Sequence, residues 1–382
     1  MAKKAYLTID GTHRNVKKRF LTDNNVYHKV KKAFITIGGV HRPFMASGLE
    51  YFGEVASLSN AVQWLSATYT ENHAIFAGGD KGGTAGSGTN RYSAVIEAYD
   101  NDAQKTVLSS QFTTSRAYVG TTSVEGVAMF AGGSRGRGYE LNDVFGVDDD
   151  FVLLKSSSNL NTNQDSLVGA SYGDTAVFGG GISASGTSLK TAHCYSSELV
   201  FIARWSGISA ARCAAASLDD VAMFAGGMPS SYTDSVDVVR DTVASYGVAK
   251  LSVARGFLAG TRIHDCVLFA GGNTSNGRSA VVDAYDAELT RISGVANLSV
   301  ARSAFPAVTV EDCALFLGGE IKSGITSAVD AYDAELTRTI PQSLTEGRAC
   351  HAATKTGNMV YIGGGKRDSA EYSASVEAYI YG

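Results

Sequence analysis

Short apolar runs that end in paired glycines recur along most of this chain of 382 residues. The seven runs are AIFAGG (74–79), AMFAGG (128–133), AVFGGG (176–181), AMFAGG (222–227), VLFAGG (267–272), ALFLGG (314–319) and VYIGGG (360–365). The final glycine pair of each run begins 45 to 54 residues after the pair before it. A repeat of this length is typical of the four-stranded units of a propeller.

Each repeat reads as four short strands. In four repeats the first strand follows an arginine that lies 16 residues before the glycine pair: Arg116, Arg255, Arg302 and Arg348. The apolar run is the second strand, and its continuous hydrophobicity predicts burial on both faces. The third strand alternates in character, as in SAVVDAYD (279–286), and the fourth has the weakest pattern, as expected of an outer strand.

The order of these features resembles the kelch repeat: an apolar run into Gly-Gly, an acidic strand with Tyr-Asp, then an arginine at the next first strand. The resemblance covers residues 49–382 and implies an all-β, seven-bladed, kelch-like β-propeller. The sequence departs from the kelch pattern at one position, where a kelch unit usually has a tryptophan near its fourth strand. That residue is missing from the repeats, since the only tryptophans are Trp64 and Trp205.

The two ends of the propeller sequence complete each other. The last repeat stops after its third strand at VEAYIYG (376–382), so it lacks a fourth strand. The segment LEYFGEVASLSNAV (49–62) aligns with LTRISGVANLSVAR (289–302), which contains the fourth strand of another repeat. We predict that Tyr51–Leu58 supplies the outer strand of the last blade, which closes the ring and removes an open edge. The propeller domain is then 45–382.

Residues 1–44 follow a different repeat. Three units of fourteen residues read KKAYLTIDGTHRNV (3–16), KKRFLTDNNVYHKV (17–30) and KKAFITIGGVHRPF (31–44). Their centres are Asp10-Gly11, Asn24-Asn25 and Gly38-Gly39, dipeptides that suit two-residue hairpin turns because they tolerate positive φ. The pattern predicts three short β-hairpins. Such hairpins are marginal alone, so we expect other copies of the chain or a docking protein to hold them.

Charge separates the two parts. Residues 1–44 hold ten Lys/Arg and two Asp/Glu, a net +8, and the remainder holds 23 basic and 35 acidic residues, a net −12. The acidic large domain argues against a nucleic-acid partner. No apolar run approaches the roughly 18 residues of a membrane span, and the basic start lacks the apolar core of a signal peptide. We expect synthesis in a host cytoplasm and no membrane insertion.

The loops between the second and third strands are the candidate binding face, because they vary most in length and content on a constant scaffold. They span 80–92, 134–142, 182–189, 228–233, 273–278, 320–326 and 366–373. Tyrosine with arginine suits sugar rings or an anionic surface polymer, and ordinary solvated loops are the alternative. The candidate residues are Arg91, Tyr92, Arg135, Arg137, Tyr139, Tyr232, Lys366, Arg367 and Tyr372.

The repeated arginines are expected at the same face, near the mouth of the channel. Arg116, Arg255, Arg302 and Arg348 occupy one position of the repeat, and Arg212 lies two residues out of step. Two roles are open for them. They contact a ligand, as this position can in kelch proteins, or they tie neighbouring blades to the repeated acidic residues.

Catalytic motifs are missing from the sequence. It contains no HExxH, P-loop, GxSxG or sialidase Asp-box, and its seven histidines are scattered. Five cysteines lie far apart, which suggests neither a disulfide framework nor a CxxC metal site. We therefore expect no enzyme activity, no metal and no cofactor, although acids and arginines in the channel leave a sugar-modifying enzyme open.

The KKAY-type units resemble the N-terminal segments of tail and fibre proteins of phages and prophages of Gram-positive bacteria. The second unit departs from the pattern at Asp23 and Asn25. The resemblance implies attachment to other tail or baseplate proteins through 1–44, a place on the tail of a virion or phage-like particle, and a homotrimer. The propeller would then recognise a host surface glycan or protein. A purely structural tail component and a kelch-type glycan-modifying enzyme are the alternatives.

Overall fold

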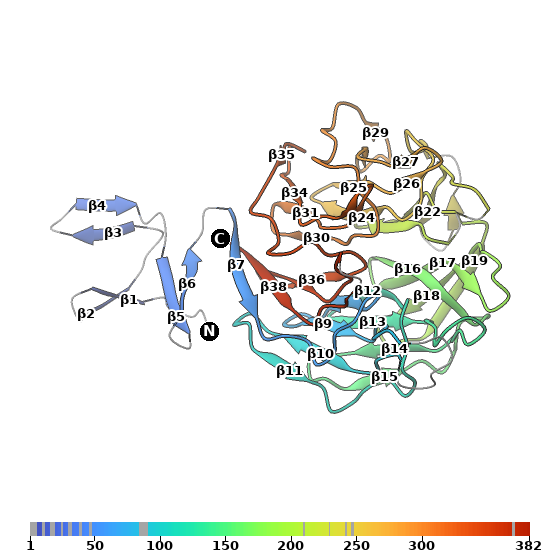
Figure 1. Ribbon diagram of the computed structural model, residues 1–382, viewed down its shortest axis with the longest axis horizontal. Helices are drawn as coiled ribbons and strands as arrows, with labels where there is room; N and C mark the ends of the chain where they lie inside the picture. The colour runs from blue at the N-terminus through green and yellow to red at the C-terminus, as the bar shows by residue number, and fades with distance from the viewer. Residues whose placement is uncertain are drawn as a thin grey trace.

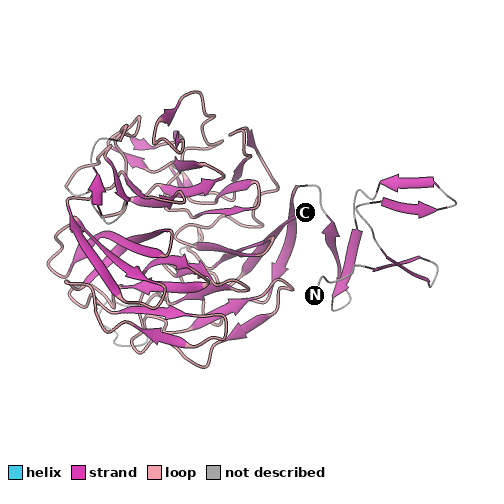
Figure 2. Ribbon diagram, turned by 180° about the vertical axis from the view of Figure 1, so that it is seen from behind, coloured by secondary structure: helices cyan, strands magenta, loops and turns pink. Residues whose placement is uncertain are grey.

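The computed structural model describes residues 48–83, 91–208, 211–228, 230–240, 248–368 and 371–382, and the backbone of further strands at 243–245 and before residue 46. Seven four-stranded antiparallel sheets surround a central channel (Figure 1). Viewed from behind, the described chain consists of strands and loops (Figure 2). The fold is an all-β, seven-bladed propeller. No helix in this part of the chain is long and apolar enough to cross a membrane.

Blades 1 to 3 follow one another from strand to neighbouring strand. Blade 1 holds β8 (Ser66–Tyr69), β9 (Ala74–Ala77), β10 (Ile96–Tyr99) and β11 (Lys105–Val107). Blade 2 holds β12 (Gly120–Val124), β13 (Val127–Ala131), β14 (Val144–Val147) and β15 (Leu153–Lys155). Blade 3 holds β16 (Gln164–Tyr172), β17 (Thr175–Ser183), β18 (Thr191–Ser196) and β19 (Phe201–Ser206).

Blades 4 to 6 repeat this order, and two of them carry an extra hairpin. Blade 4 holds β20 (Ala214–Ser217), β21 (Ala222–Ala225), β22 (Val236–Arg240) and β23 (Val243–Ser245). Blade 5 holds β24 (Ala259–Ile263), β25 (Cys266–Ala270), β28 (Val282–Tyr285) and β29 (Arg291–Ile292), with the hairpin β26 (Asn273–Thr274) and β27 (Gly277–Arg278). Blade 6 holds β30 (Ala307–Val310), β31 (Cys313–Leu317), β34 (Val329–Tyr332) and β35 (Arg338–Thr339), with the hairpin β32 (Glu320–Ile321) and β33 (Gly324–Ile325).

Blade 7 joins the two ends of the propeller sequence. Its strands are β36 (Ala352–Thr356), β37 (Met359–Gly363), β38 (Val376–Tyr381) and β7 (Leu49–Val55), and β38 pairs antiparallel with β7. The closing strand therefore starts and ends earlier than the predicted 51–58. Tyr51 fixes it further, because its hydroxyl donates to Glu377 at 2.9 Å and its ring meets Tyr379 edge-on.

Three strand pairs precede the propeller. β1 (Tyr6–Ile9) pairs with β2 (Thr12–Asn15), β3 (Phe20–Asp23) with β4 (Val26–Lys29), and β5 (Ala33–Ile37) with β6 (Val40–Met45), each antiparallel. The turn dipeptides at 10–11, 24–25 and 38–39 lie outside the described residues. The hairpin repeat of residues 1–44 therefore stays a prediction.

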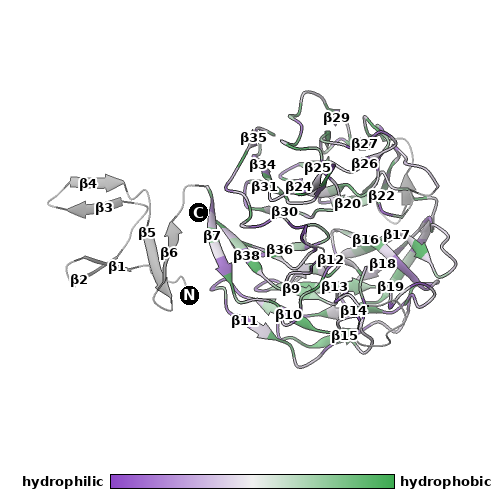
Figure 3. Cartoon of the chain, in the orientation of Figure 1, coloured by the Kyte–Doolittle hydropathy of each residue, from purple (hydrophilic) through white to green (hydrophobic). Residues whose placement is uncertain are grey.

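The apolar second and third strands form the core between blades. Val127–Ala131 of β13 is coloured as hydrophobic in Figure 3, and four of its five residues are buried. Aromatic side chains of adjoining strands meet in this layer, as where Phe316 contacts Tyr332 at 5.7 Å between ring centroids. Continuous apolar sequence in these strands is explained by burial against blades on both sides.

The paired glycines leave space for the backbone of the next blade. At Gly78, Gly226, Gly271 and Gly318, a Cβ would lie 2.4 to 2.6 Å from the carbonyl oxygen of the repeated arginine that precedes the first strand of a neighbouring blade. The second glycine of each pair donates its N–H to that same carbonyl at 2.8 Å. Any side chain at the first glycine would force the two blades apart, so the pair exists to let them bond directly.

Each of the four repeated arginines bonds to two blades. Its carbonyl accepts from the preceding blade, while its guanidinium reaches an acidic residue of its own blade. Arg302 pairs with Asp330 at 2.7 Å, Arg348 with Glu377 at 2.7 Å and Arg255 with Asp283 at 2.8 Å. Burial lowers the pKa of these three arginines, and the facing carboxylates oppose that shift.

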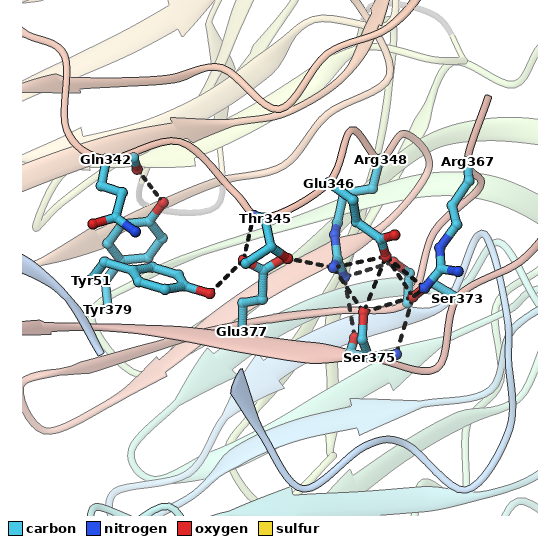
Figure 4. Close-up of polar contacts among 11 residues, drawn as sticks. Tyr51, Gln342, Thr345, Glu346, Arg348, Arg367, Ser373, Ser375, Glu377 and Tyr379 are labelled. Carbon is cyan, nitrogen blue, oxygen red and sulfur yellow. Dashed lines mark hydrogen bonds and ion pairs between the residues drawn. The ribbon is translucent and has the colours of Figure 1, made fainter. Parts of the chain in front are cut away.

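The acidic partner also holds the loop that links the blades. In blade 7, Glu377 accepts from Arg348, from the Tyr51 hydroxyl and from the backbone N–H of Thr345 (Figure 4). Asp330 likewise accepts from the N–H of Ser299 at 3.0 Å. A fully bonded buried ion pair of this kind fixes one arrangement of neighbouring blades, since removing one partner would leave a buried charge without compensation.

We expect the glycine contact to be sensitive to a single methyl group. Gly271→Ala should destabilise the protein by about 3 kcal/mol or more, because its Cβ would meet both the Arg302 carbonyl and the Phe305 ring. Gly294→Ala is the matched control, since Gly294 also has positive φ but nothing within 4 Å of its Cβ position. Chemical denaturation of both variants measures the difference, and equal losses of stability would contradict the explanation.

Removal of the closing strand should cost more than removal of the segment before it. A chain that begins at residue 56 lacks β7 and leaves β38 as an open edge, whereas a chain that begins at residue 45 keeps the closed ring. We expect the shorter chain to melt at least about 5 °C below the longer one. Differential scanning calorimetry tests this, and identical melting temperatures would show that β7 does not close the propeller.

Candidate functional site

A cavity of about 1010 Å³ lies at one mouth of the central channel. Residues that start the first strands line it together with residues of the loops between second and third strands. We call it the mouth cavity. A second cavity, of about 760 Å³, lies at the other end of the first strands, and its lining includes six Thr and three Ser. Several of those hydroxyls bond across blades, such as Thr68 to the Thr122 carbonyl at 2.8 Å, which gives them a structural role.

Seven residues, one from each blade, form a ring around the mouth cavity. Each lies 14 residues before the glycine pair, has a φ of 52° to 63° and contributes to the cavity wall. We call them the mouth ring: Trp64, Tyr118, Ser166, Arg212, Phe257, Ala304 and Cys350. Left-handed backbone is uncommon for residues other than glycine, so its recurrence in seven blades indicates a geometry that the whole ring imposes.

Backbone hydrogen bonds link the mouth ring from blade to blade. In six cases the N–H of one member donates to the carbonyl of the member in the preceding blade, at 2.8 to 3.2 Å. The closing bond runs from Trp64 of blade 1 to Cys350 of blade 7 at 2.8 Å. A hydrogen-bonded ring of this kind holds the side chains in fixed positions before any ligand arrives.

One side of the mouth cavity is aromatic. The rings of Trp64 and Tyr118 lie 5.3 Å apart at an angle of 34°, and Tyr92 lines the cavity beside them. Burial raises the pKa of the Tyr118 hydroxyl, so this group stays a neutral donor and acceptor. Across the ring, the Arg212 guanidinium lies 5.1 Å from the centre of the Phe257 ring.

Charged groups of both signs complete the wall. Arg91 forms two bonds to Asp80, at 3.0 and 2.8 Å, and this pairing raises the pKa of its guanidinium. Glu140 and Asp165 also line the cavity. Burial raises the pKa of Asp165, Glu140 raises it further, and hydrogen bonds and the charge of Arg212 oppose the shift. The arrangement offers flat apolar faces together with fixed hydrogen-bonding groups.

The structure divides the predicted binding residues into two groups. Arg91, Tyr92 and Arg137 line the mouth cavity. The others lie outside its lining: Arg135, Tyr139, Tyr232, Lys366, Arg367 and Tyr372. Two of these have structural partners, since Tyr372 accepts from Gln63 at 2.9 Å and Arg367 pairs with Glu346 at 2.6 Å.

The repeated arginines are a correction to the expected binding face. Arg116, Arg255, Arg302 and Arg348 are each 0% exposed, and none lines the mouth cavity. Their guanidinium groups lie inside the blades on carboxylates and carbonyls, so a ligand at the mouth does not reach them. Of the two roles left open by the sequence, the tie between neighbouring blades describes these residues. Arg212 differs because it belongs to the mouth ring.

The sequence prediction missed the mouth ring and the two acids. A signal was present, because the position 14 residues before the glycine pair varies from Trp to Ala while its surroundings repeat. Arg212 appeared out of step with the repeated arginines because it occupies this position. No sequence pattern marks Glu140 or Asp165. Glu140 lies in a loop and Asp165 at the start of a strand, and only the closed ring of blades brings both to the cavity wall.

Comparison with known proteins identifies the fold. The solved structure of YjhT is similar, with a TM-score of 0.57 and 14% sequence identity, and the match covers 75% of this chain and 99% of YjhT. No protein-family model matches the chain, and no curated protein matches it. At this identity the likeness establishes a kelch-like, seven-bladed propeller fold, and it carries no statement about activity.

Asp165 should destabilise the folded protein at neutral pH. The folded protein binds the Asp165 proton more tightly than the unfolded chain does, because the pKa of Asp165 is raised in the folded state. The free energy of unfolding therefore falls as the pH rises from the ordinary pKa of Asp to the raised value. We expect Asp165→Asn to raise the melting temperature at pH 7. The gain should shrink as the pH is lowered toward about 3.9, the ordinary pKa of Asp.

Thermal melts of both proteins across this pH range measure the effect. Asp368→Asn, at an exposed position outside the cavity lining, is the control and should show no comparable gain. A lower melting temperature for Asp165→Asn at pH 7 would contradict the assignment.

Proposed function

We propose that this chain is a tail-associated protein of a phage or phage-like particle and that its propeller recognises a glycan on the host cell surface. The observation that carries the recognition part is the mouth cavity with its aromatic side and its hydrogen-bonded ring. The assignment to a tail rests on the resemblance of residues 1–44 to tail and fibre segments.

A glycan suits the chemistry of the mouth cavity. Sugar rings present C–H faces that stack on aromatic side chains such as Trp64 and Tyr118, and hydroxyls that bond to planar charged groups such as Arg91 and Asp165. A cavity of about 1010 Å³ is at the upper end of the range for ligand sites and has room for several sugar units. The rigid ring lowers the entropy that binding must overcome.

Attachment is assigned to residues 1–44. Their net charge of +8 contrasts with −12 in the rest of the chain, which favours separate partners for the two parts. Other tail or baseplate proteins, or the same segment in two further copies, would hold the predicted hairpins. The propeller would then face outward with the mouth cavity free.

A glycan-modifying enzyme is the second candidate. Its supporting observation is the pair Glu140 and Asp165 at the mouth cavity, because a carboxyl group with a raised pKa is suited to act as a general acid. Release of soluble sugar from host cell-wall glycan, lost in Asp165→Asn, would favour this candidate over simple recognition. A purely structural tail component would show neither binding nor release.

Binding to susceptible cells tests the proposal. We expect the fluorescently labelled full chain to bind such cells, and Trp64→Ala combined with Tyr118→Ala to reduce binding at least about tenfold, since stacking contributes roughly 1 kcal/mol per ring. Tyr139→Ala is the control, because Tyr139 is 68% exposed and lies outside the cavity lining.

The outcomes separate the candidates. A chain without residues 1–44 should still bind cells, because recognition is assigned to the propeller. Equal binding by the double variant and the unaltered chain would show that the mouth cavity is not the receptor site. No binding by the full chain to any susceptible cell would favour the structural alternative.

A further inference from the structure

Glu140 has an unused binding capacity at the wall of the mouth cavity. Its side chain is 6% exposed, and its Oε1 accepts from the backbone N–H of Gly138 at 3.2 Å. Its Oε2 is buried and has no hydrogen-bond partner among the described residues. A buried carboxylate oxygen without a donor is costly, so a site that retains one is suited to a ligand that supplies the donor.

Asp165 places a second carboxylate near the first. The backbones of Ser134 and Glu140 form an isolated antiparallel β-bridge. Asp165 lies near the start of β16, and both acids line the mouth cavity. The two acids interact, since Glu140 contributes to the raised pKa of Asp165. Two like charges in a partly buried cavity repel each other, and a cation between them would relieve that repulsion.

Neither acid is in direct contact with a basic side chain of the described residues, although the charge of Arg212 acts on Asp165. Among the described residues, no ion pair within 4.0 Å joins Glu140 or Asp165 to a basic side chain. Arg91 is occupied by Asp80, and Arg212 lies over Phe257. Within the described part of the chain, neither carboxylate of the mouth cavity therefore has a basic side chain in direct contact, and both are able to accept a cation from a ligand.

Aromatic rings stand beside the two acids. Asp165 influences the pKa of both Tyr92 and Tyr118, which places its charge near these rings, and Trp64 adjoins Tyr118. The face of an aromatic ring attracts a cation, and a desolvated ammonium gains more from this contact than an exposed one. Carboxylates with aromatic rings form a suitable environment for a substituted ammonium group.

We propose that the mouth cavity binds a glycan that carries a positively charged amine, with the ammonium held by Glu140 and Asp165 beside the aromatic side. This inference rests on the proposed glycan recognition and narrows it to sugars with a free amino group or an amine-bearing substituent. Neutral N-acetylated sugars lack the charge and should bind weakly. The remaining rings and Arg137 contact the neutral part of the ligand.

The test compares two sugars that differ in one group. Titration of the full chain at about pH 6 uses the trisaccharide of glucosamine and its fully N-acetylated form, with isothermal calorimetry and tryptophan fluorescence as readouts. We expect the amine form to bind about tenfold more tightly or better, and Glu140→Gln to weaken it by about ten- to a hundredfold, as loss of a charge-assisted hydrogen bond implies.

Glu140→Gln should weaken binding of the amine form more than binding of the N-acetylated form, so that the ratio of the two affinities falls. Glu371→Gln, an exposed acid outside the cavity lining, is the matched control and should change neither affinity. Melting temperatures confirm that the variants are folded. Asp165→Asn provides an independent second variant, for which a loss of affinity for the amine form is expected.

Three results would overturn the inference: equal affinity for the two sugars, no binding of the amine form, or unchanged affinity for the amine form in Glu140→Gln. These results leave the proposed function standing if the full chain binds cells through Trp64 and Tyr118. If cell binding also does not depend on those rings, recognition at the mouth cavity fails as well.

Discussion

The contact between a backbone carbonyl and a glycine pair sets the geometry of the whole propeller. The arginine carbonyl of one blade approaches the paired glycines of the blade before it. A Cβ on the first glycine would lie 2.4 to 2.6 Å from that carbonyl oxygen, closer than an ordinary contact between heavy atoms. The second glycine then donates its N–H to that carbonyl. Because this bond recurs around the ring, each blade is fixed relative to the next by backbone atoms rather than by side-chain packing alone.

The mouth ring follows from that contact. Two residues beyond the arginine position, the chain adopts left-handed backbone in each blade, and six hydrogen bonds connect these residues around the channel. The buried ion pairs, such as Arg302 with Asp330, hold the same segments from the side of the blade. The repeated arginines thus lie two residues from the mouth-ring position. Four blades carry an arginine there for the fold, whereas the mouth-ring position varies from Trp to Ala.

Under the proposed function, this separation lets the variable side chains form a site of fixed geometry. A flexible loop must be ordered when a ligand binds, whereas Trp64, Tyr118 and Arg212 belong to a series of seven residues that six backbone bonds connect. The cost is that left-handed backbone disfavours ordinary residues at each ring position. The left-handed backbone nevertheless recurs at all seven ring positions.

The sequence alone determined the propeller, because the glycine pairs, the apolar runs and the repeat length are local patterns with a fixed physical meaning. It also indicated that β7 belongs with the last blade, since the final repeat lacked a strand, although the strand proved to be Leu49–Val55. The site was only partly predictable. Arg91, Tyr92 and Arg137 were chosen from loop composition, but whether Arg302 meets solvent or Asp330 depends on how adjacent blades approach. Only the closed ring decided that, and it brought Glu140 of one blade to Asp165 of the next, because neither residue has any sequence pattern that records its distance from the other.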